Sequence, residues 1–131
     1  MPAFGERSRS RLEQVHPLMR QLMERVVEII DITVLTGHRT REDQTEAYNT
    51  GKSKLQWPDS KHNQLPSTAV DIAPYPIPTG WKPQTFYYVA GVVKAEAHHM
   101  GLKIRWGGDW DGDDDLHDQT FNDLVHFELK G

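Results

Sequence analysis

The chain has no cysteine among its 131 residues, so it has no disulfide framework, no cysteine-bound zinc and no thiol nucleophile. It also lacks any apolar run near the roughly 18 residues that suggest a membrane-spanning helix. Its first residues include charged side chains such as Glu6 and Arg7 and no apolar segment of the secretory type. We therefore expect no signal peptide, no insertion into a membrane, and a protein that first occupies the cytoplasm.

A strong excess of charge of either sign is also missing. The net charge of −4 gives no electrostatic reason to expect nucleic acid or an anionic membrane as a partner. Lys and Arg are frequent in residues 1–61 and acidic residues in 109–123, which we interpret as solvated surface, with contact to a charged polymer as the alternative. The length and the 37% hydrophobic content fit one compact domain, expected to span residues 1–131.

Apolar periodicity and turn residues predict the secondary structure. Helices are expected from Pro17 to Ile30, from Thr40 towards Gly51, and from Phe86 to Met100. Short strands are expected over 32–35, 69–73, 102–106 and 124–129, with loops over 52–68 and 107–118. The predicted helix faces contain Leu18, Leu22, Val26, Ile29 and Ile30, and then Phe86, Val89, Ala90, Val93, Ala97 and Met100. This order indicates an α+β fold with helices packed on one face of a small, mainly antiparallel sheet.

Two histidines and one carboxylate form a candidate zinc site. His62, Asp71 and His126 offer ligands suited to zinc, and three protein ligands leave a fourth position open for chemistry. Asp71 lies in an apolar strand, where a carboxylate is costly to bury without a cation or donors, although simple alternation could also turn it to solvent. A lone histidine is more often structural, and the helical H-E-x-x-H motif is absent.

Several short motifs occur in the order found in a known group of enzymes. The pattern S-x-H-x-x-G-x-A-x-D is matched at Ser60, His62, Ala69 and Asp71, and D-x-x-H-F-E at Asp123, His126, Phe127 and Glu128. Further matches are Ser10, Leu12 and Val15-His16-Pro17, Gly37-His38-Arg39-Thr40 with Gln44, Gly51-Lys52-Ser53-Lys54, and Arg105-Trp106-Gly107-Gly108-Asp109-Trp110. The chain thus resembles the M15 family of zinc peptidases, most closely its phage endolysin branch of L-alanyl-D-glutamate endopeptidases. The resemblance implies the α+β fold that this family shares with D-Ala-D-Ala carboxypeptidases and Hedgehog signalling domains.

The resemblance also implies residue roles. It makes His62, Asp71 and His126 the zinc ligands and Asp123 the catalytic carboxylate that takes and returns a proton. Arg39 would bind the substrate or stabilise its developing oxyanion, the alternative being a salt bridge to a surface carboxylate. Ser60 is a candidate hydrogen-bond partner of the substrate or of a ligand.

Three positions bear on how far the family pattern applies. Gln44 matches the pattern but could simply be a helix residue. The interval from His62 to Asp71 is nine residues against seven in the pattern, and Ser67 replaces the usual glycine. The two extra residues leave the path of the loop around Pro66 open and affect the ligand identities less.

The acidic segment that follows the expected strand over 102–106 is a candidate site for a second cation. Asp109, Asp111, Asp113 and Asp115 alternate, as oxygen ligands do at the start of a calcium loop. Gly112 and Thr120 break the EF-hand pattern, because glycine stands at position 4 and threonine at position 12. Both a solvated acidic loop and a regulatory calcium site, as in some endolysin relatives, stay open.

We therefore expect a monomeric zinc peptidase that binds bacterial peptidoglycan and cuts its peptide stem. The resemblance makes the bond between L-alanine and D-glutamate the expected target. By resemblance it would act as a phage endolysin, held in the host cytoplasm until release to the periplasm and cell wall. The alternatives are a D-Ala-D-Ala carboxypeptidase or dipeptidase of the same family, and a non-catalytic zinc-containing wall-binding module. Asp123 separates the last alternative from the others, because a binding module needs the metal ligands but no base.

Overall fold

The computed structural model describes residues 2–76, 82–109 and 123–130. Its centre is a four-stranded sheet of β1 (Ile32–Thr36), β2 (Ala69–Pro74), β3 (Ile104–Gly107) and β4 (Asp123–Leu129). The strand order is β1-β2-β4-β3, and each neighbouring pair is antiparallel. The helices are α1 (Glu6–Leu12), α2 (Pro17–Ile29), α3 (Arg41–Asn49) and α4 (Pro83–His99), with a short 3₁₀ helix, η1 (Lys61–Asn63). The predicted α+β class with an antiparallel sheet is confirmed.

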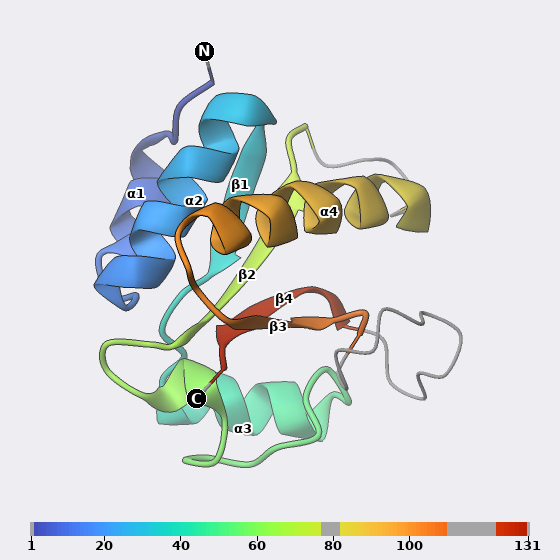
Figure 1. The fold of residues 1–131 in the computed structure, drawn as a ribbon. Coiled ribbons are helices and arrows are strands. Elements are labelled where there is room, and N and C mark those ends of the chain that lie inside the picture. Colours follow the sequence, from blue (N-terminus) through green and yellow to red (C-terminus); the bar gives the residue numbers. More distant parts are fainter. Residues whose placement is uncertain (1, 77–81, 110–122, 131) are drawn as a thin grey trace.

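The helices cover both sides of the sheet. Figure 1 shows α4 on one side of β3 and β4, next to α2, and α3 on the opposite side. The expectation of helices on one face is therefore wrong for α3. That helix buries only Gln44 and Ala47, so it has no apolar stripe with which to join the main core. Among the described residues, no helix is both long and apolar enough to cross a membrane.

The core lies between the sheet and the pair α2 and α4. Phe127 of β4 and Ile72 of β2 are 1% exposed, and Trp106 of β3 stacks on Phe127 with ring centroids 6.3 Å apart. Burying side chains of this size contributes about 1.5–3 kcal/mol each. The rest of this cluster includes Leu22, Met23, Val26, Val34, Val70, Val89 and Val93. Packing on this face holds β2 and β4 rigidly, so the side chains on their other face keep fixed positions.

The buried stripe of α2 differs from the predicted one. Leu18 is 42% exposed and Ile29 is 58% exposed, so neither belongs to the core. Leu22 and Val26 are buried as predicted, and Met19, Met23 and Val27 are buried with them. These five residues recur at the helical spacing i, i+3, i+4, i+7 and i+8, so the two methionines and Val27 complete the apolar face.

Two short helices lie outside the predicted elements. The first, α1, has only seven residues and buries Ser8 and Leu12, so its apolar periodicity is too brief to read. The second, η1, lies inside the predicted loop over 52–68 and is capped by Ser60, whose Oγ accepts from the backbone N–H of His62 at 3.2 Å. The same loop is tied to the N-terminal segment, because His16 donates its N–H to the Ser67 carbonyl at 2.8 Å. This tie holds the end of the 52–68 loop against the N-terminal segment.

Candidate metal and catalytic site

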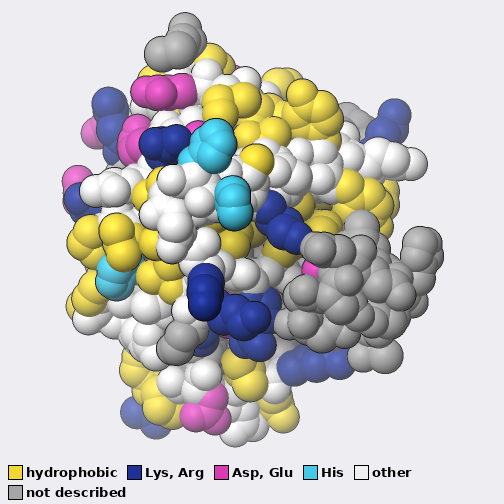
Figure 2. All heavy atoms as spheres, viewed as in Figure 1, with side chains coloured by type: hydrophobic (Ala, Val, Ile, Leu, Met, Phe, Trp, Pro, Cys, Tyr) yellow, Lys and Arg dark blue, Asp and Glu magenta, His cyan; other side chains and the backbone are white. Residues whose placement is uncertain are grey.

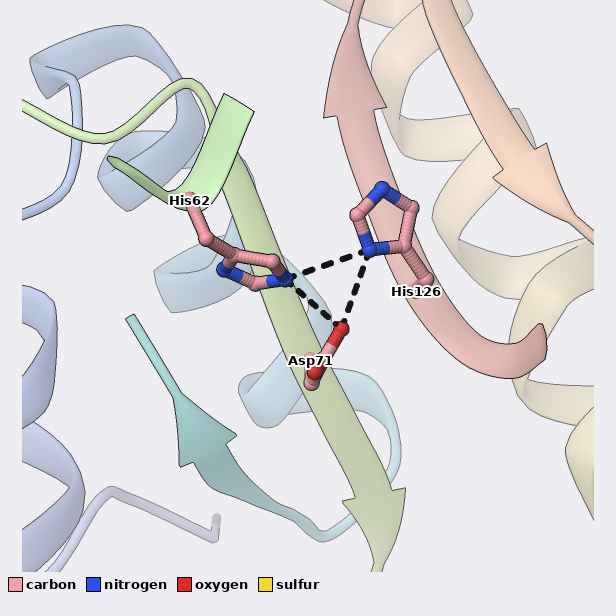
Figure 3. A group of neighbouring side chains, drawn as sticks. All are labelled: His62, Asp71 and His126. Atoms are coloured by element: carbon pink, nitrogen blue, oxygen red, sulfur yellow. Dashed lines mark hydrogen bonds and ion pairs between the residues drawn. The ribbon is translucent and has the colours of Figure 1, made fainter. Parts of the chain in front are cut away.

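His62, Asp71 and His126 converge on one point between η1, β2 and β4 (Figure 3). The Nε2 atom of His62 and the Nδ1 atom of His126 each lie 3.1 Å from Oδ1 of Asp71. The two nitrogens are 3.2 Å apart. All three residues are buried, with exposed fractions of 1%, 7% and 7%. The structure therefore brings together the group that the sequence predicted as a metal site.

Strand register and a helix cap bring these side chains together. Asp71 and His126 are direct cross-strand partners in the β2–β4 pair, so their side chains leave the same face of the sheet. His62 comes from η1, whose position is set by the Ser60 cap. Asp71 does not face solvent, so alternation alone was misleading here: every residue of β2 is buried.

The hydrogen bonds of the two imidazoles leave lone pairs at the point of convergence. His62 Nδ1–H donates to the carbonyl of Gly37 at 2.7 Å, and His126 Nε2–H donates to Oε1 of Glu128 at 2.8 Å. With neutral rings, His62 Nε2, His126 Nδ1 and the Asp71 carboxylate then all face one another as acceptors. Three acceptors at this separation repel one another unless a cation or a proton lies among them. This donor set fits a metal ion.

The spacing also suits zinc. Tetrahedral zinc with bonds of about 2.0–2.1 Å separates its ligand atoms by about 3.3–3.4 Å. The observed separations of 3.1, 3.1 and 3.2 Å between the donor atoms of His62, Asp71 and His126 are within a few tenths of an ångström of that value. Small side-chain adjustments would complete the geometry. The group can therefore bind a metal ion, and its N,N,O chemistry is of a kind that zinc takes.

Electrostatics in the metal-free protein place a proton where the metal would bind. Burial opposes the protonation of His126, but hydrogen bonds to Asp71 and Glu128 outweigh it and raise the pKa of His126 to about 9. Burial likewise opposes ionisation of Asp71, but the interactions with His62 and His126 hold the pKa of Asp71 far below its usual range. At neutral pH, therefore, Asp71 is a carboxylate and His126 carries the proton that a metal must displace.

Asp123 stands at the start of β4 and lines the same cavity as His62 and His126. Burial and the nearby charge of Asp71 raise the pKa of Asp123 to about 6. It is thus ionised at pH 7 yet basic enough to accept a proton, which suits a general base. Asp123 can take this position only because residue 107 is a glycine. Any Cβ at Gly107 would collide with the backbone carbonyl of Asp123. The close approach of β3 and β4 at this bulge depends on that missing side chain.

Arg39 is held beside the cluster of His62, Asp71 and His126 and not at the surface. Its guanidinium donates to Oδ2 of Asp71 at 3.3 Å and to Oε1 of Gln44 at 3.0 Å. The alternative of a salt bridge to a surface carboxylate is therefore wrong, because its partner Asp71 is buried. The backbone N–H of Arg39 also donates to the carbonyl of His62 at 2.8 Å, which links the two residues directly.

Gln44 is the centre of a buried hydrogen-bond network, not an ordinary helix residue. It is 0% exposed, and its Nε2 donates to Ser53 Oγ at 3.0 Å and to the Leu55 carbonyl at 2.6 Å. Its Oε1 accepts from Asn63 as well as from Arg39. Gln44 therefore fixes the 53–55 loop, the end of η1 and Arg39 relative to one another. The family motif was the only sequence signal for it, because nothing in the helix pattern distinguished a buried glutamine.

The site opens into a cavity of about 260 Å³. Its lining carries the cations Arg39, Lys52, Lys54, Lys61 and Arg105, and the acids Asp59, Asp123 and Glu128, with Ser60 also in its wall. On the face shown in Figure 2, Lys and Arg side chains gather in the middle, between β3 and α3. A larger hollow of about 580 Å³ along α1 and α2 is lined by none of His62, Asp71 and His126. The cation-rich cavity suits a substrate that carries carboxylates.

The candidate calcium ligands lie mostly beyond the described residues. Asp111, Asp113 and Asp115 fall outside them, and only Asp109, which is 5% exposed, is described. Within the described ranges, no group of His, Asp and Glu other than His62, Asp71 and His126 is close enough to share an ion. The described structure thus gives no support for calcium.

Comparison with known proteins gives one consistent result. The model of the family described as phage L-alanyl-D-glutamate peptidase matches residues 2–130. The L-alanyl-D-glutamate peptidase of Escherichia phage T5 is 30% identical over 120 residues, which cover 88% of this chain and 87% of that protein. The crystal structure of the Serratia marcescens L-Ala D-Glu endopeptidase ChiX superposes with a TM-score of 0.76 at 26% identity, covering 98% of this chain and 91% of that one.

Proposed function

The chain belongs to the phage L-alanyl-D-glutamate peptidase family, and on that premise we propose that it is a zinc-dependent endopeptidase of bacterial peptidoglycan. The bond cut is the one between L-alanine and D-glutamate in the peptide stem, and the biological role is host lysis. The observation that supports a metal mechanism is the convergence of three buried acceptor atoms within 3.1–3.2 Å. The wall is the substrate, so the enzyme acts after release from the host cytoplasm.

His62, Asp71 and His126 would hold the zinc ion. When bound, zinc supplies Lewis-acid catalysis, because it polarises a carbonyl and makes water a nucleophile near neutral pH. The protein contributes the orientation of the ligands: the Gly37 carbonyl fixes the ring of His62, and Glu128 fixes the ring of His126. Ligands oriented in this way lose little conformational freedom when the ion binds.

Asp123 is the proposed proton carrier. Its carboxylate would accept the proton of the attacking water and then donate it to the nitrogen of D-glutamate as the peptide bond breaks. Burial and the neighbouring carboxylate of Asp71 both raise the pKa of Asp123, and a carboxyl group with a raised pKa is better able to hold a proton during the reaction. Its place in the cavity wall beside His126 puts it within the reaction space.

Arg39 and the other cations of the cavity are the proposed substrate contacts. Arg39 has a guanidinium fixed on one side by Asp71 and Gln44, and it would stabilise the oxyanion that develops on the alanyl carbonyl. A D-glutamyl residue has two carboxyl groups, and only one can extend the peptide. The other can remain as a carboxylate, which Lys52 and Lys54 in the cavity wall would attract. Ser60 supports the site through the η1 cap.

The deciding experiment is mass spectrometry of purified peptidoglycan digested by the zinc-loaded protein, with Asp123→Asn as the matched inactive control. New L-alanine carboxyl ends and D-glutamate amino ends are expected, lost after chelation and restored by zinc. Release of terminal D-alanine alone would instead identify a carboxypeptidase. No new ends from several wall types, with zinc bound, would overturn the enzymatic proposal in favour of a wall-binding module.

A further inference from the structure

Glu128 has a buried carboxylate for which the proposed reaction has no direct use. It is 5% exposed and lies two residues after His126, on the same face of β4. We infer that Glu128, clamped by Arg105 and Lys61, is a positioning residue that selects which nitrogen of His126 faces the metal. The inference rests on the proposed metal role of His126 and extends it to residues outside the ligand group.

The two carboxylate oxygens of Glu128 have separate partners. Oε1 accepts from Nε2–H of His126 at 2.8 Å. Oε2 accepts from Arg105, at 2.8 Å from one terminal nitrogen and 3.2 Å from Nε, and lies 3.2 Å from Nζ of Lys61. One oxygen therefore orients the imidazole, while the other is fixed by two cations. A carboxylate held on both sides cannot rotate away from the ring without breaking charge-assisted hydrogen bonds.

The partners of Glu128 come from two different parts of the site. Arg105 is its direct cross-strand neighbour in the β3–β4 pair. Lys61 precedes the ligand His62 in η1 and also donates to the Leu129 carbonyl at 2.7 Å. The clamp thus ties the helix that carries His62 to the strand that carries His126. Both ligands are placed by the same set of contacts.

The choice of ring nitrogen follows from this contact. An imidazole can coordinate a metal through either nitrogen, and the nitrogen that donates a hydrogen bond elsewhere is excluded. Because Nε2 of His126 donates to Glu128, its Nδ1 is left for the metal, 3.1 Å from Asp71 Oδ1. His62 is fixed in the opposite sense by a backbone carbonyl, which no side-chain substitution removes. Substitution of Glu128 therefore tests what selects the coordinating nitrogen of His126.

The test compares Glu128→Ala and Glu128→Gln with Glu96→Ala as the matched control. Glu96 also pairs with an arginine, Arg25 at 3.1 Å, but on α4 and away from the site. Zinc affinity is measured by competition with a chelator, and nitrogen NMR of the His126 ring identifies the coordinating atom. Glu128→Ala should weaken zinc binding by about 10- to 100-fold and mix the two coordination modes. Glu128→Gln should retain Nδ1 coordination with a smaller loss, because an amide oxygen can still accept from Nε2–H.

Two outcomes would overturn the inference. One is a Glu128→Ala protein whose zinc affinity stays within twofold of the parent and whose His126 still binds through Nδ1 alone. The other is an equal loss in the Glu96→Ala control. If Glu128→Ala does not fold, zinc affinity and the coordinating nitrogen of His126 are measured in Arg105→Ala and Glu128→Gln instead. A parent protein that binds no zinc would refute the proposed metal function alone. In that case the hydrogen bond from His126 to Glu128 is still tested by NMR: the Nε2–H resonance of His126 should be present in the parent and lost without Glu128.

Discussion

Zinc binding at pH 7 should release about one proton per ion from His126. In the metal-free protein its pKa is raised to about 9 from 6.5, so the imidazole is almost fully protonated at neutral pH. The metal needs the neutral ring and must displace that proton. Asp71 contributes no proton, because its pKa is held far below its usual range and it is already ionised.

The size of the effect follows from the distance between pH and pKa. Two pH units below a pKa of about 9, displacement of the proton costs about 3 kcal/mol, or roughly 100-fold in apparent zinc affinity. Affinity should therefore rise about tenfold per unit between pH 7 and pH 9 and then level off. The stability of the metal-free fold changes with pH in the opposite direction. The raised pKa of His126 contributes fully to the free energy of unfolding below pH 6.5, and this contribution is lost as the pH rises through 9.

Isothermal titration calorimetry provides the assay. Zinc is titrated at pH 7 in buffers of different ionisation enthalpy, and the slope of the observed enthalpy gives the number of protons released. The Glu96→Ala protein is the control, because its substitution lies outside the site. A slope near zero, or an affinity that does not change between pH 7 and pH 9, would refute the reasoning about the proton shared by Asp71 and His126.

Three further predictions concern the residues around the metal group. Asp123→Asn should lower kcat by about 10²–10⁴-fold with zinc affinity unchanged, as measured by peptide release, and an active variant would remove the proposed base. Gly107→Ala should lower activity at least about tenfold while the protein still binds one zinc, because the new Cβ collides with the Asp123 carbonyl; unchanged kinetics would contradict this. Gln44→Ala should cost about 1–3 kcal/mol in urea unfolding, because buried partners including Arg39 lose their bonds, whereas the exposed Gln21→Ala should cost little.

The elements that surround the site could largely be predicted, because their signals are local. Thr40 caps α3 by accepting from the N–H of Asp43 at 3.2 Å, as the capping pattern indicated. The period of two in β4 placed His126 and Glu128 on one face. Prediction failed where the signal was not local. The exposure of Leu18 could not be read from α2 alone, because neighbouring elements decide which stripe of a helix is covered.

The candidate ligands were also named from the sequence, but their catalytic and metal roles remain proposals. Spacing alone supported the three-ligand site no more strongly than its absence, and the family resemblance is what favoured it. Gln44 looked like any polar helix residue, although it is fully buried. Its environment is made by residues of η1 and the 53–55 loop, which a helical pattern does not contain.

The sequence by itself determined the chemistry that is available: two imidazoles, one strand-borne carboxylate, a nearby Asp123 and no thiol. It also determined the strands that carry these groups, since period and turn residues act over a few positions. Only the tertiary structure decided that ring nitrogens of His62 and His126, 64 residues apart in the chain, lie 3.2 Å from each other. Ring orientation and the raised pKa of Asp123 were decided there too. Such properties depend on distances between distant segments, and those distances are set by the packing of the whole core.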